Sequence, residues 1–296
     1  MEGSQCFKGS GVALITPFNE DMSVNYLKVS ELVEYHCENN TDALIILGTT
    51  GEASTLTDDE KVKIVETVLE VNKKRLPIIV GAGSNNTIQA IEMSKKYEKL
   101  GVDGLLLVTP YYNKGNEDGI YKHFVSIAEF VNLPIMLYNV PGRTGVNLSI
   151  NLLKKLAKHK NIVALKEASG DISYACEVAR LVPELALYSG NDDITIPLMS
   201  IGAVGTVSVL ANIEPKVVHN MVENFFNGDV KEAQRLQLKY NGLVKSLFLE
   251  VNPIPVKEAM NILGKGVGKC RLPLGDMEEK NIAILKKELE EVGEVV

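Results

Sequence analysis

Residues 162–167 read Ile-Val-Ala-Leu-Lys-Glu, and this stretch decides the fold and the chemistry to look for. Four apolar residues in succession are typical of a short strand buried on both faces of a parallel sheet. The run ends on Lys166, so an amine lies where a buried strand opens into a pocket. Desolvation disfavours a charged lysine, so we expect a lowered pKa and a free-amine nucleophile near neutral pH. Taken alone, the pattern favours a solvated lysine just past a strand end, so the rest of the chain must support the chemical interpretation.

Short apolar runs of this kind recur along the chain, and segments with helical spacing separate them. The apolar runs are residues 12–16, 43–47, 78–80, 104–109, 135–138, 162–166, 185–188 and 203–209. Helical spacing includes Leu27, Leu32 and Tyr35 in the first separating segment, and residues 87–100 form the third. Eight alternations of strand and helix favour a closed α/β barrel, the TIM (β/α)8 fold. A doubly wound open sheet would normally carry Gly-x-Gly-x-x-Gly after its first strand, where this chain has Thr16-Pro17-Phe18.

The pattern changes after residue 209, where only helical segments follow. We predict helices over residues 225–240, 241–250, 255–263 and 278–292, and hence a small C-terminal helical extension. The expected division is a catalytic barrel over residues 1–224 and a helical domain over residues 225–296. The glycine-rich stretch 264–270 imitates a phosphate loop, but it is one residue short and ends in Cys270, so we interpret it as a linker.

Composition excludes several classes of protein. The 296 residues are 45% hydrophobic and 23% charged with a net charge of −7, which fits a globular chain with no basic surface for nucleic acid. The four cysteines and four histidines are scattered, so we expect reduced thiols and no metal site. The N-terminus lacks the pattern of a signal peptide, and no apolar stretch approaches the ~20 residues that span a bilayer. We expect a cytoplasmic protein that acts on small molecules, without contact with a membrane.

Polar residues cluster where the predicted strands end. The second strand is followed by Gly48-Thr49-Thr50-Gly51-Glu52, the fourth by Thr109-Pro110-Tyr111-Tyr112, the fifth by Tyr138 to Arg143, and the sixth ends on Lys166. In a barrel these strand ends converge on one mouth, where active sites lie. Each motif alone also has a structural interpretation, such as a helix-capping loop, an aromatic patch or a plain turn. There is no carboxylate pair for glycoside hydrolysis and no Ser-His-Asp arrangement.

The complete series of motifs resembles the pyruvate-dependent class I aldolase family over nearly the whole chain. It comprises Gly48–Glu52, Thr109–Tyr112, Tyr138-Asn139-Val140-Pro141-Gly142-Arg143-Thr144-Gly145, Lys166-Glu167-Ala168, Ser189-Gly190-Asn191-Asp192 and Asn252-Pro253-Ile254-Pro255-Val256-Lys257. The resemblance implies that Lys166 forms a Schiff base with pyruvate, and that Tyr138, Thr49 and Tyr112 relay protons. It further implies that Thr50, Arg143, Val207 and Gly190 bind substrate, without a cofactor or a metal.

In this family the counterpart of Tyr112 reaches across from a neighbouring subunit, which implies a homo-oligomer; we expect a tetramer, a dimer of dimers. Arg143 indicates which reaction is catalysed, because a guanidinium binds a carboxylate with two parallel hydrogen bonds. The implied partners are pyruvate and L-aspartate 4-semialdehyde, condensed to 4-hydroxy-tetrahydrodipicolinate in lysine and diaminopimelate biosynthesis. The alternatives are a lyase for N-acetylneuraminate or keto-deoxy sugar acids and a non-catalytic paralogue.

The resemblance also implies a cleft for L-lysine as an effector. The positions concerned are Asn85, Gln89, Tyr111, Asp58, Lys61, Ala53 and Ser54. Gln89 stands where lysine-inhibited relatives have a glutamate, and Asp58 and Lys61 stand where histidines are common. Because an amide binds an ammonium less strongly than a carboxylate does, we expect weak inhibition by lysine or none.

Overall fold

The computed structural model describes residues 5–294 of the chain. Within these residues eight parallel strands follow one another in chain order around a closed barrel, which confirms the predicted (β/α)8 fold. The strands are β1 (Gly9–Ala13), β2 (Ala43–Ile46), β3 (Ile78–Gly81), β4 (Gly104–Val108), β5 (Ile135–Asn139), β6 (Ile162–Glu167), β7 (Ala186–Ser189) and β8 (Gly205–Ser208). Most strand residues are buried, as continuous apolar runs of parallel strands require.

The predicted strand bounds shift by a few residues in the structure. The largest shift is in β1, which begins at Gly9 and ends at Ala13 rather than covering residues 12–16. Gly9 and Ser10 lack the apolar side chains by which we recognise a strand, yet Ser10 is completely buried, and its backbone N–H donates to Asp42 Oδ2 at 2.7 Å. A side chain outside the apolar pattern therefore supports the start of this strand.

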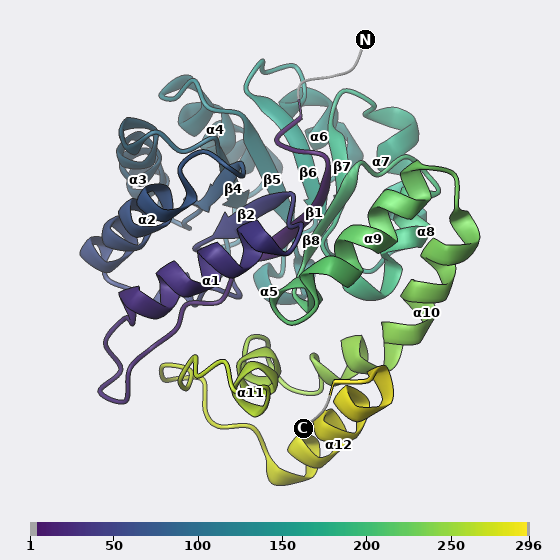
Figure 1. The fold of residues 1–296 in the computed structure, drawn as a ribbon. Coiled ribbons are helices and arrows are strands. Elements are labelled where there is room, and N and C mark those ends of the chain that lie inside the picture. Colours follow the sequence, from purple (N-terminus) through teal and green to yellow (C-terminus); the bar gives the residue numbers. More distant parts are fainter. Residues whose placement is uncertain (1–4, 295–296) are drawn as a thin grey trace. The chain divides into compact units, whose positions relative to one another are not determined.

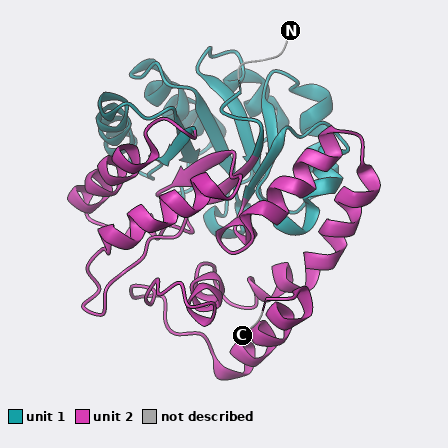
Figure 2. Cartoon of the chain, in the orientation of Figure 1, with its two compact units in different colours: residues 1–9, 77–207 teal, residues 10–76, 208–296 magenta. Residues whose placement is uncertain are grey.

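Figure 2 shows that the chain forms two compact units, each built from two stretches of sequence. The first unit comprises the described residues up to Gly9 together with Pro77–Val207. Its helices are α3 (Thr87–Leu100), α4 (Glu117–Glu129), α5 (Pro141–Thr144), α6 (Ile150–Leu156), α7 (Ile172–Leu181) and α8 (Thr195–Met199), with the 3-10 turn η2 (Asp192–Ile194). In this unit α3 packs on α4, α4 on α6, and α6 on α7 (Figure 1). Strands β4 to β7 pair in unbroken succession.

The second unit comprises Ser10–Leu76 together with the described residues from Ser208 onward. Its helices are α1 (Tyr26–Glu38), α2 (Asp58–Asn72), α9 (Pro215–Phe226), α10 (Val230–Ser246), α11 (Ile254–Ile262) and α12 (Glu279–Val292), with the 3-10 turns η1 (Ala53–Thr55) and η3 (Leu210–Asn212). Helix α1 packs on α2, α9 on α10, and α12 on both α10 and α11. A capping box of Thr57 and Glu60 starts α2.

The C-terminal helical extension is present, but two of its predicted helices are wrong. The segments 225–240 and 241–250 are not separate helices, because one helix, α10, runs through residue 240. The chain turns between α9 and α10 at Gly228, which has φ +87°, and Asp229 caps the N-terminus of α10 by accepting from Glu232 N. Leu27, counted as a core position of α1, is 73% exposed. The division after residue 224 stays a prediction. No helix within residues 5–294 is long and apolar enough to cross a membrane.

Candidate active site

Lys166 lies near the end of β6 and is paired with Tyr138 on the neighbouring strand. The two residues are register partners across β5 and β6, so their side chains leave the sheet on the same face. Lys166 Nζ lies 4.2 Å from the centroid of the Tyr138 ring, and each residue is 6% exposed. Among residues 5–294 the lysine amine makes no hydrogen bond or ion pair. The lysine is therefore buried at a strand end, as its sequence pattern suggested, and the proton-relay role of Tyr138 stays a prediction.

Gly190 gives the Lys166 side chain the space that it occupies. A Cβ atom at Gly190 would lie 3.1 Å from Lys166 Cε, 2.7 Å from Ala168 Cβ and 3.0 Å from Glu167 O. The Gly190 N–H donates to that same Glu167 carbonyl at 2.7 Å, so the backbone itself approaches β6 closely. Only glycine fits this approach without a shift of its neighbours. The sequence analysis named Gly190 as substrate-binding, and the structure places it against the lysine.

A buried polar network behind Lys166 was not foreseen as a feature of its own. Asn139, completely buried, donates through Nδ2 to Glu167 Oε2 and to Asn147 Oδ1, both at 2.7 Å, and its Oδ1 accepts from Leu148 N. Glu167 Oε1 accepts from Ser169 N at 2.5 Å, and burial raises the pKa of Glu167. The network joins β5, β6 and the segment after Arg143. The sequence signal is that a polar residue follows Tyr138 and another follows Lys166 directly in the chain. In the structure these two residues, Asn139 and Glu167, are register partners across β5 and β6.

Arg143 lies in the short helix α5, and it is exposed. The helix begins with Pro141 at its first turn and ends at Gly145, whose φ of +68° favours glycine. The Lys114 side chain covers Gly145, because a Cβ there would lie 2.6 Å from Lys114 Cε. The structural interpretation of Pro141-Gly142 was a plain turn, whereas the chain forms the short helix α5 here, with Arg143 as its third residue.

Tyr111 and Tyr112 follow β4 in an exposed turn. Tyr112 is 89% exposed and has φ +70°, an unusual conformation for an aromatic residue. Tyr111 is 37% exposed, and its carbonyl accepts from Asn85 Nδ2 at 3.2 Å. Asn113 Nδ2 returns a bond of 3.0 Å to Asn85 O. The turn is thus held by amide contacts, while the Tyr112 ring itself projects away from the chain.

In the second unit, Thr49 and Thr50 belong to a tight turn after β2. Leu47 and Glu52, on either side of it, have φ +54° and +52°, and such left-handed residues cost about 1–2 kcal/mol each. Thr50 is buried, and its Oγ1 accepts from Asn252 Nδ2 at 2.9 Å. The Thr49 carbonyl accepts from Glu52 N at 3.1 Å. A turn strained at two residues needs support from elsewhere in the unit.

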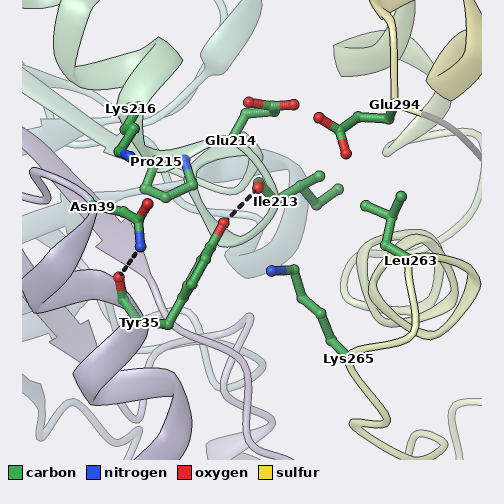
Figure 3. Close-up of a pocket in the computed structure, with 9 residues that line it drawn as sticks. All are labelled: Tyr35, Asn39, Ile213, Glu214, Pro215, Lys216, Leu263, Lys265 and Glu294. Carbon is green, nitrogen blue, oxygen red and sulfur yellow. Dashed lines mark hydrogen bonds between the residues drawn. The ribbon is translucent and has the colours of Figure 1, made fainter.

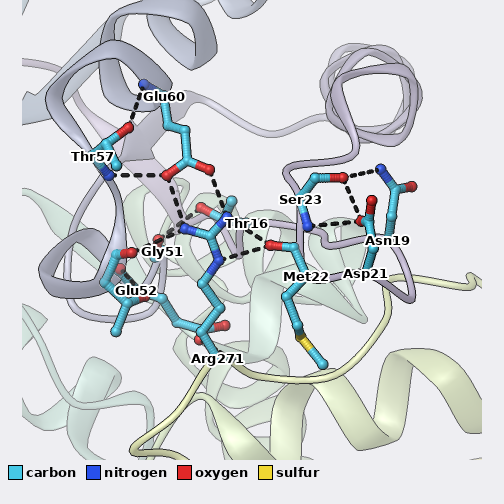
Figure 4. Close-up of polar contacts among 11 residues, drawn as sticks. Thr16, Asn19, Asp21, Met22, Ser23, Gly51, Glu52, Thr57, Glu60 and Arg271 are labelled. Atoms are coloured by element: carbon cyan, nitrogen blue, oxygen red, sulfur yellow. Dashed lines mark hydrogen bonds and ion pairs between the residues drawn. The ribbon is translucent and has the colours of Figure 1, made fainter.

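That support comes from Lys257 and Arg271 of the C-terminal segment. Lys257 Nζ donates to Glu52 Oε1 at 3.0 Å and to the carbonyls of Thr16 and Lys269 at 3.1 and 2.6 Å. Arg271 N donates to the other Glu52 oxygen at 2.9 Å, and its guanidinium pairs with Glu60, as Figure 4 shows. The sequence analysis missed Glu52 and Arg271 as partners, because more than two hundred residues separate them in the chain.

The remaining predicted positions lie as follows. Val207 is a buried residue of β8. Gln89 is exposed in the first turn of α3 and accepts from Ser84 Oγ at 2.9 Å. Asp58 and Lys61 form an ion pair of 3.2 Å at the start of α2, so the Lys61 ammonium is engaged within its own helix. Ala53 and Ser54 belong to η1. Within residues 5–294 no group of three His, Cys, Asp or Glu side chains is placed to hold a metal ion.

A second polar cavity lies in the second unit, away from the turn at Thr50 in sequence. Figure 3 shows the carboxylates of Glu214 and Glu294 facing one another across it. Lys265 Nζ lies 3.7 Å from the centroid of the Tyr35 ring, and Tyr35 donates from its hydroxyl to Ile213 O at 3.0 Å. Burial and the Glu294 carboxyl raise the pKa of Glu214 to about 8. This cavity contains none of the residues that the sequence analysis assigned to chemistry.

The fold is a (β/α)8 barrel with a buried lysine on the sixth strand, and this lysine lies over a tyrosine ring of the fifth strand. These features place the chain in the class of aldolase-like barrels that the motifs predicted. The sequence profile of the dihydrodipicolinate synthetase family matches residues 6–292, and the chain belongs to this family. The 4-hydroxy-tetrahydrodipicolinate synthase of Caldicellulosiruptor bescii is 53% identical and covers 97% of both chains. The family resemblance drawn from the sequence is therefore confirmed.

Solved structures agree with this assignment. The dihydrodipicolinate synthase of Thermotoga maritima superposes with a TM-score of 0.96 at 40% identity, over 98% of this chain and 100% of that one. The lysine-bound DHDPS of Cyanidioschyzon merolae gives a TM-score of 0.95 at 42% identity, over 99% of this chain and 100% of that one. Similarity at this level covers the barrel and the helical extension alike.

Proposed function

We propose that this chain is a lyase that condenses pyruvate with L-aspartate 4-semialdehyde, giving 4-hydroxy-tetrahydrodipicolinate and water for the biosynthesis of diaminopimelate and lysine. Family membership and the names of the relatives support this reaction over the sugar-acid lyase and the non-catalytic paralogue. The observation that carries it is the Lys166 amine, buried beside the Tyr138 hydroxyl-bearing ring with no acceptor among residues 5–294.

The proposed chemistry begins with attack of Lys166 Nζ on the ketone carbon of pyruvate. The carbinolamine loses water to give an imine, and loss of a methyl proton turns the imine into an enamine. The enamine carbon attacks the aldehyde carbon of the second substrate. The amine of that substrate then attacks the imine carbon and displaces Lys166, which closes the ring and frees the enzyme.

We assign the proton transfers to Tyr138, Thr49 and Tyr112, because a chain of hydroxyls moves protons without placing a charge beside the amine. Thr50 binds the pyruvate carboxylate, with Val207 and Gly190 beside the bound substrate. The exposed Tyr112 side chain suits the family arrangement, in which it enters a neighbouring subunit. We therefore propose a homo-oligomer, in particular a tetramer built as a dimer of dimers.

Trapping of the imine tests this function. Pyruvate and borohydride should convert Lys166 to a stable secondary amine that peptide mass spectrometry locates. Lys166→Ala should remove the label. Lys257 serves as the internal control, because it is also buried but already holds three acceptors. A label on Lys257, or no label on the unaltered protein, contradicts the proposal.

Arg143 is proposed to bind the carboxylate of L-aspartate 4-semialdehyde. Arg143→Ala should leave trapping of pyruvate at Lys166 unchanged and should lower turnover. A charged hydrogen bond contributes about 1.5–3 kcal/mol, so we expect a loss of roughly 10- to 150-fold. Equal damage to trapping and turnover would show that Arg143 supports the loop rather than the second substrate.

We further propose that L-lysine inhibits weakly or not at all at the positions Asn85, Gln89, Tyr111, Asp58, Lys61, Ala53 and Ser54. Gln89 carries no negative charge to bind the ammonium of L-lysine. The Asp58 carboxylate, which could do so, is already paired with Lys61. Titration of activity with L-lysine tests this, and Gln89→Glu alone should not restore full inhibition. Strong inhibition below millimolar lysine contradicts it.

A further inference from the structure

The hydrogen bond between Asn252 and Thr50 has a direction, and that direction matters for the chemistry. Asn252 Nδ2 donates to Thr50 Oγ1 at 2.9 Å, and both residues are buried. A threonine hydroxyl has one proton and two lone pairs, whereas an amide nitrogen has protons only. Asn252 therefore occupies a lone pair of Thr50 and leaves the hydroxyl proton to be donated elsewhere.

We infer that Asn252 is a positioning residue that fixes the Thr50 hydroxyl as a hydrogen-bond donor toward the carboxylate of the keto-acid substrate. The inference rests on the proposed function, in which Thr50 binds that carboxylate. Without Asn252, the hydroxyl rotates and donates to any nearby acceptor. With it, the donor orientation is set before the substrate arrives.

The rest of the C-terminal segment holds the same turn, which gives this contact a rigid base. Asn252 lies five residues before Lys257, whose amine binds Glu52, two residues after Thr50. Gly51 lies between Thr50 and Glu52, and its carbonyl accepts from Thr16 Oγ1 at 2.7 Å (Figure 4). A Cβ at Gly51 would lie 3.2 Å from both Leu14 O and Leu47 N, so the backbone is tightly enclosed. Asn252 thus contacts a turn that is also held at Gly51 and Glu52.

Two substitutions separate the orientation of Thr50 from its mere presence. Asn252→Ala removes the donor, and we expect the pyruvate concentration that half-saturates trapping at Lys166 to rise roughly 3- to 10-fold. Asn252→Asp keeps the shape but supplies an acceptor, which takes the Thr50 proton and repels the substrate carboxylate. We expect a rise of roughly 10- to 100-fold for this variant, with little change in the trapping rate at saturating pyruvate.

A double-mutant cycle with Thr50→Val identifies the route of the effect. If Asn252 acts through the Thr50 hydroxyl, Asn252→Ala has no further effect once that hydroxyl is gone. Acetone, which has the ketone but no carboxylate, should be trapped at Lys166 equally well by all these variants. Asn261→Asp is the matched control, because Asn261 belongs to the same segment but binds Gly268 O and Val267 N.

The outcomes distinguish the two claims. Failure of the unaltered protein to trap pyruvate at Lys166 overturns the proposed function. Normal trapping with additive effects of Asn252→Ala and Thr50→Val overturns the role of Asn252 alone. Equal losses with pyruvate and acetone also overturn it, because they indicate damage to the fold. Should Asn252→Ala not fold, the isosteric Asn252→Asp, compared with pyruvate and acetone, decides the question.

Discussion

Two lysines lie buried among residues 5–294, Lys166 in the first compact unit and Lys257 in the second, and they have much in common. They are 6% and 2% exposed. Each amine lies over an aromatic ring, 4.2 Å from the centroid of Tyr138 and 4.3 Å from that of Phe18. They differ in their polar partners. Lys257 has a carboxylate and two carbonyls, whereas Lys166 has no acceptor among residues 5–294.

The difference is the one we expect between a structural lysine and the lysine that we propose to form the imine. Burial lowers the pKa of Lys257, but the Glu52 carboxylate opposes that shift and holds the ion pair together. Its three donors are committed to the Glu52 carboxylate and to the carbonyls of Thr16 and Lys269. An amine without acceptors is committed to no partner, so it is available to a carbonyl carbon. Burial by itself therefore does not identify a nucleophile, and it is the missing acceptor that supports our proposal for Lys166.

The largest expected effect comes from Lys166→Met, which keeps the length and apolar volume of the side chain. Turnover and imine trapping should fall below detection, because no other amine occupies this place. The free energy of unfolding should stay the same or rise, since a buried amine without acceptors is removed. Activity assays and urea unfolding measure the two effects. Strong destabilisation would mean that Lys166 is structural after all.

Lys257→Met should show the opposite pattern, with the main effect on stability. It leaves the Glu52 carboxylate, whose side chain is 0% exposed, without its cation, and breaking a buried pair costs about 3–5 kcal/mol. Adding Glu52→Gln should recover much of this loss, because the stranded charge is removed as well. Urea unfolding of the two single variants and the double variant gives the coupling. Additive effects would mean that the ion pair contributes little.

The sequence indicated the position of Lys166 at a strand end but not the partners of Lys257, for a physical reason. Lys166 follows a run of four apolar residues, and both this strand pattern and the family motif indicate a lysine at the end of a buried strand. The role of Lys257 depends on Glu52, 205 residues away in the chain, and no local pattern reports a contact of that range. The same holds for Asn252 and Thr50. The eight strands were predicted to within a few residues, because burial on two faces leaves a continuous apolar run, whereas helix ends depend on single caps such as Asp229.

A smaller effect is expected from Gly190→Ala, which tests how closely the space around Lys166 is defined. The new methyl group would lie 2.7 Å from Ala168 Cβ and 3.1 Å from Lys166 Cε, so the backbone near Ala168 must shift and the lysine side chain must move slightly. Overpacking of this kind typically costs about 1–3 kcal/mol, and we expect trapping to slow roughly 10-fold. Gly275→Ala, where a Cβ meets nothing within 4 Å, is the control. Unchanged trapping would show that the amine tolerates displacement.

Another lysine over a ring, Lys265, is intermediate between the two, because it is half-buried and lies near two carboxyls. Burial lowers its pKa, while Glu294 and Glu214 oppose the shift. Glu214 is the more informative group, since burial and its hydrogen bond with Glu294 raise its pKa from 4.5 to about 8. The folded chain therefore keeps a proton on Glu214 over a pH range in which the unfolded chain has lost it.

The sign of the resulting pH dependence follows from that proton. Between about pH 4.5 and 8 unfolding releases it, so the free energy of unfolding should fall as pH rises. The slope is at most about 1.4 kcal/mol per pH unit, and solvent contact of this partly exposed carboxyl reduces it. Glu214→Gln should flatten the curve in this window, and Glu223→Gln, an exposed residue of α9, should not. Burial lowers the pKa of His36 to about 3, which weakens the fold as pH falls below 6.5, but this acts on both variants and cancels in their difference. Parallel curves for Glu214→Gln and the unaltered protein would show that the two carboxyls share no proton, and that Lys265 alone balances them.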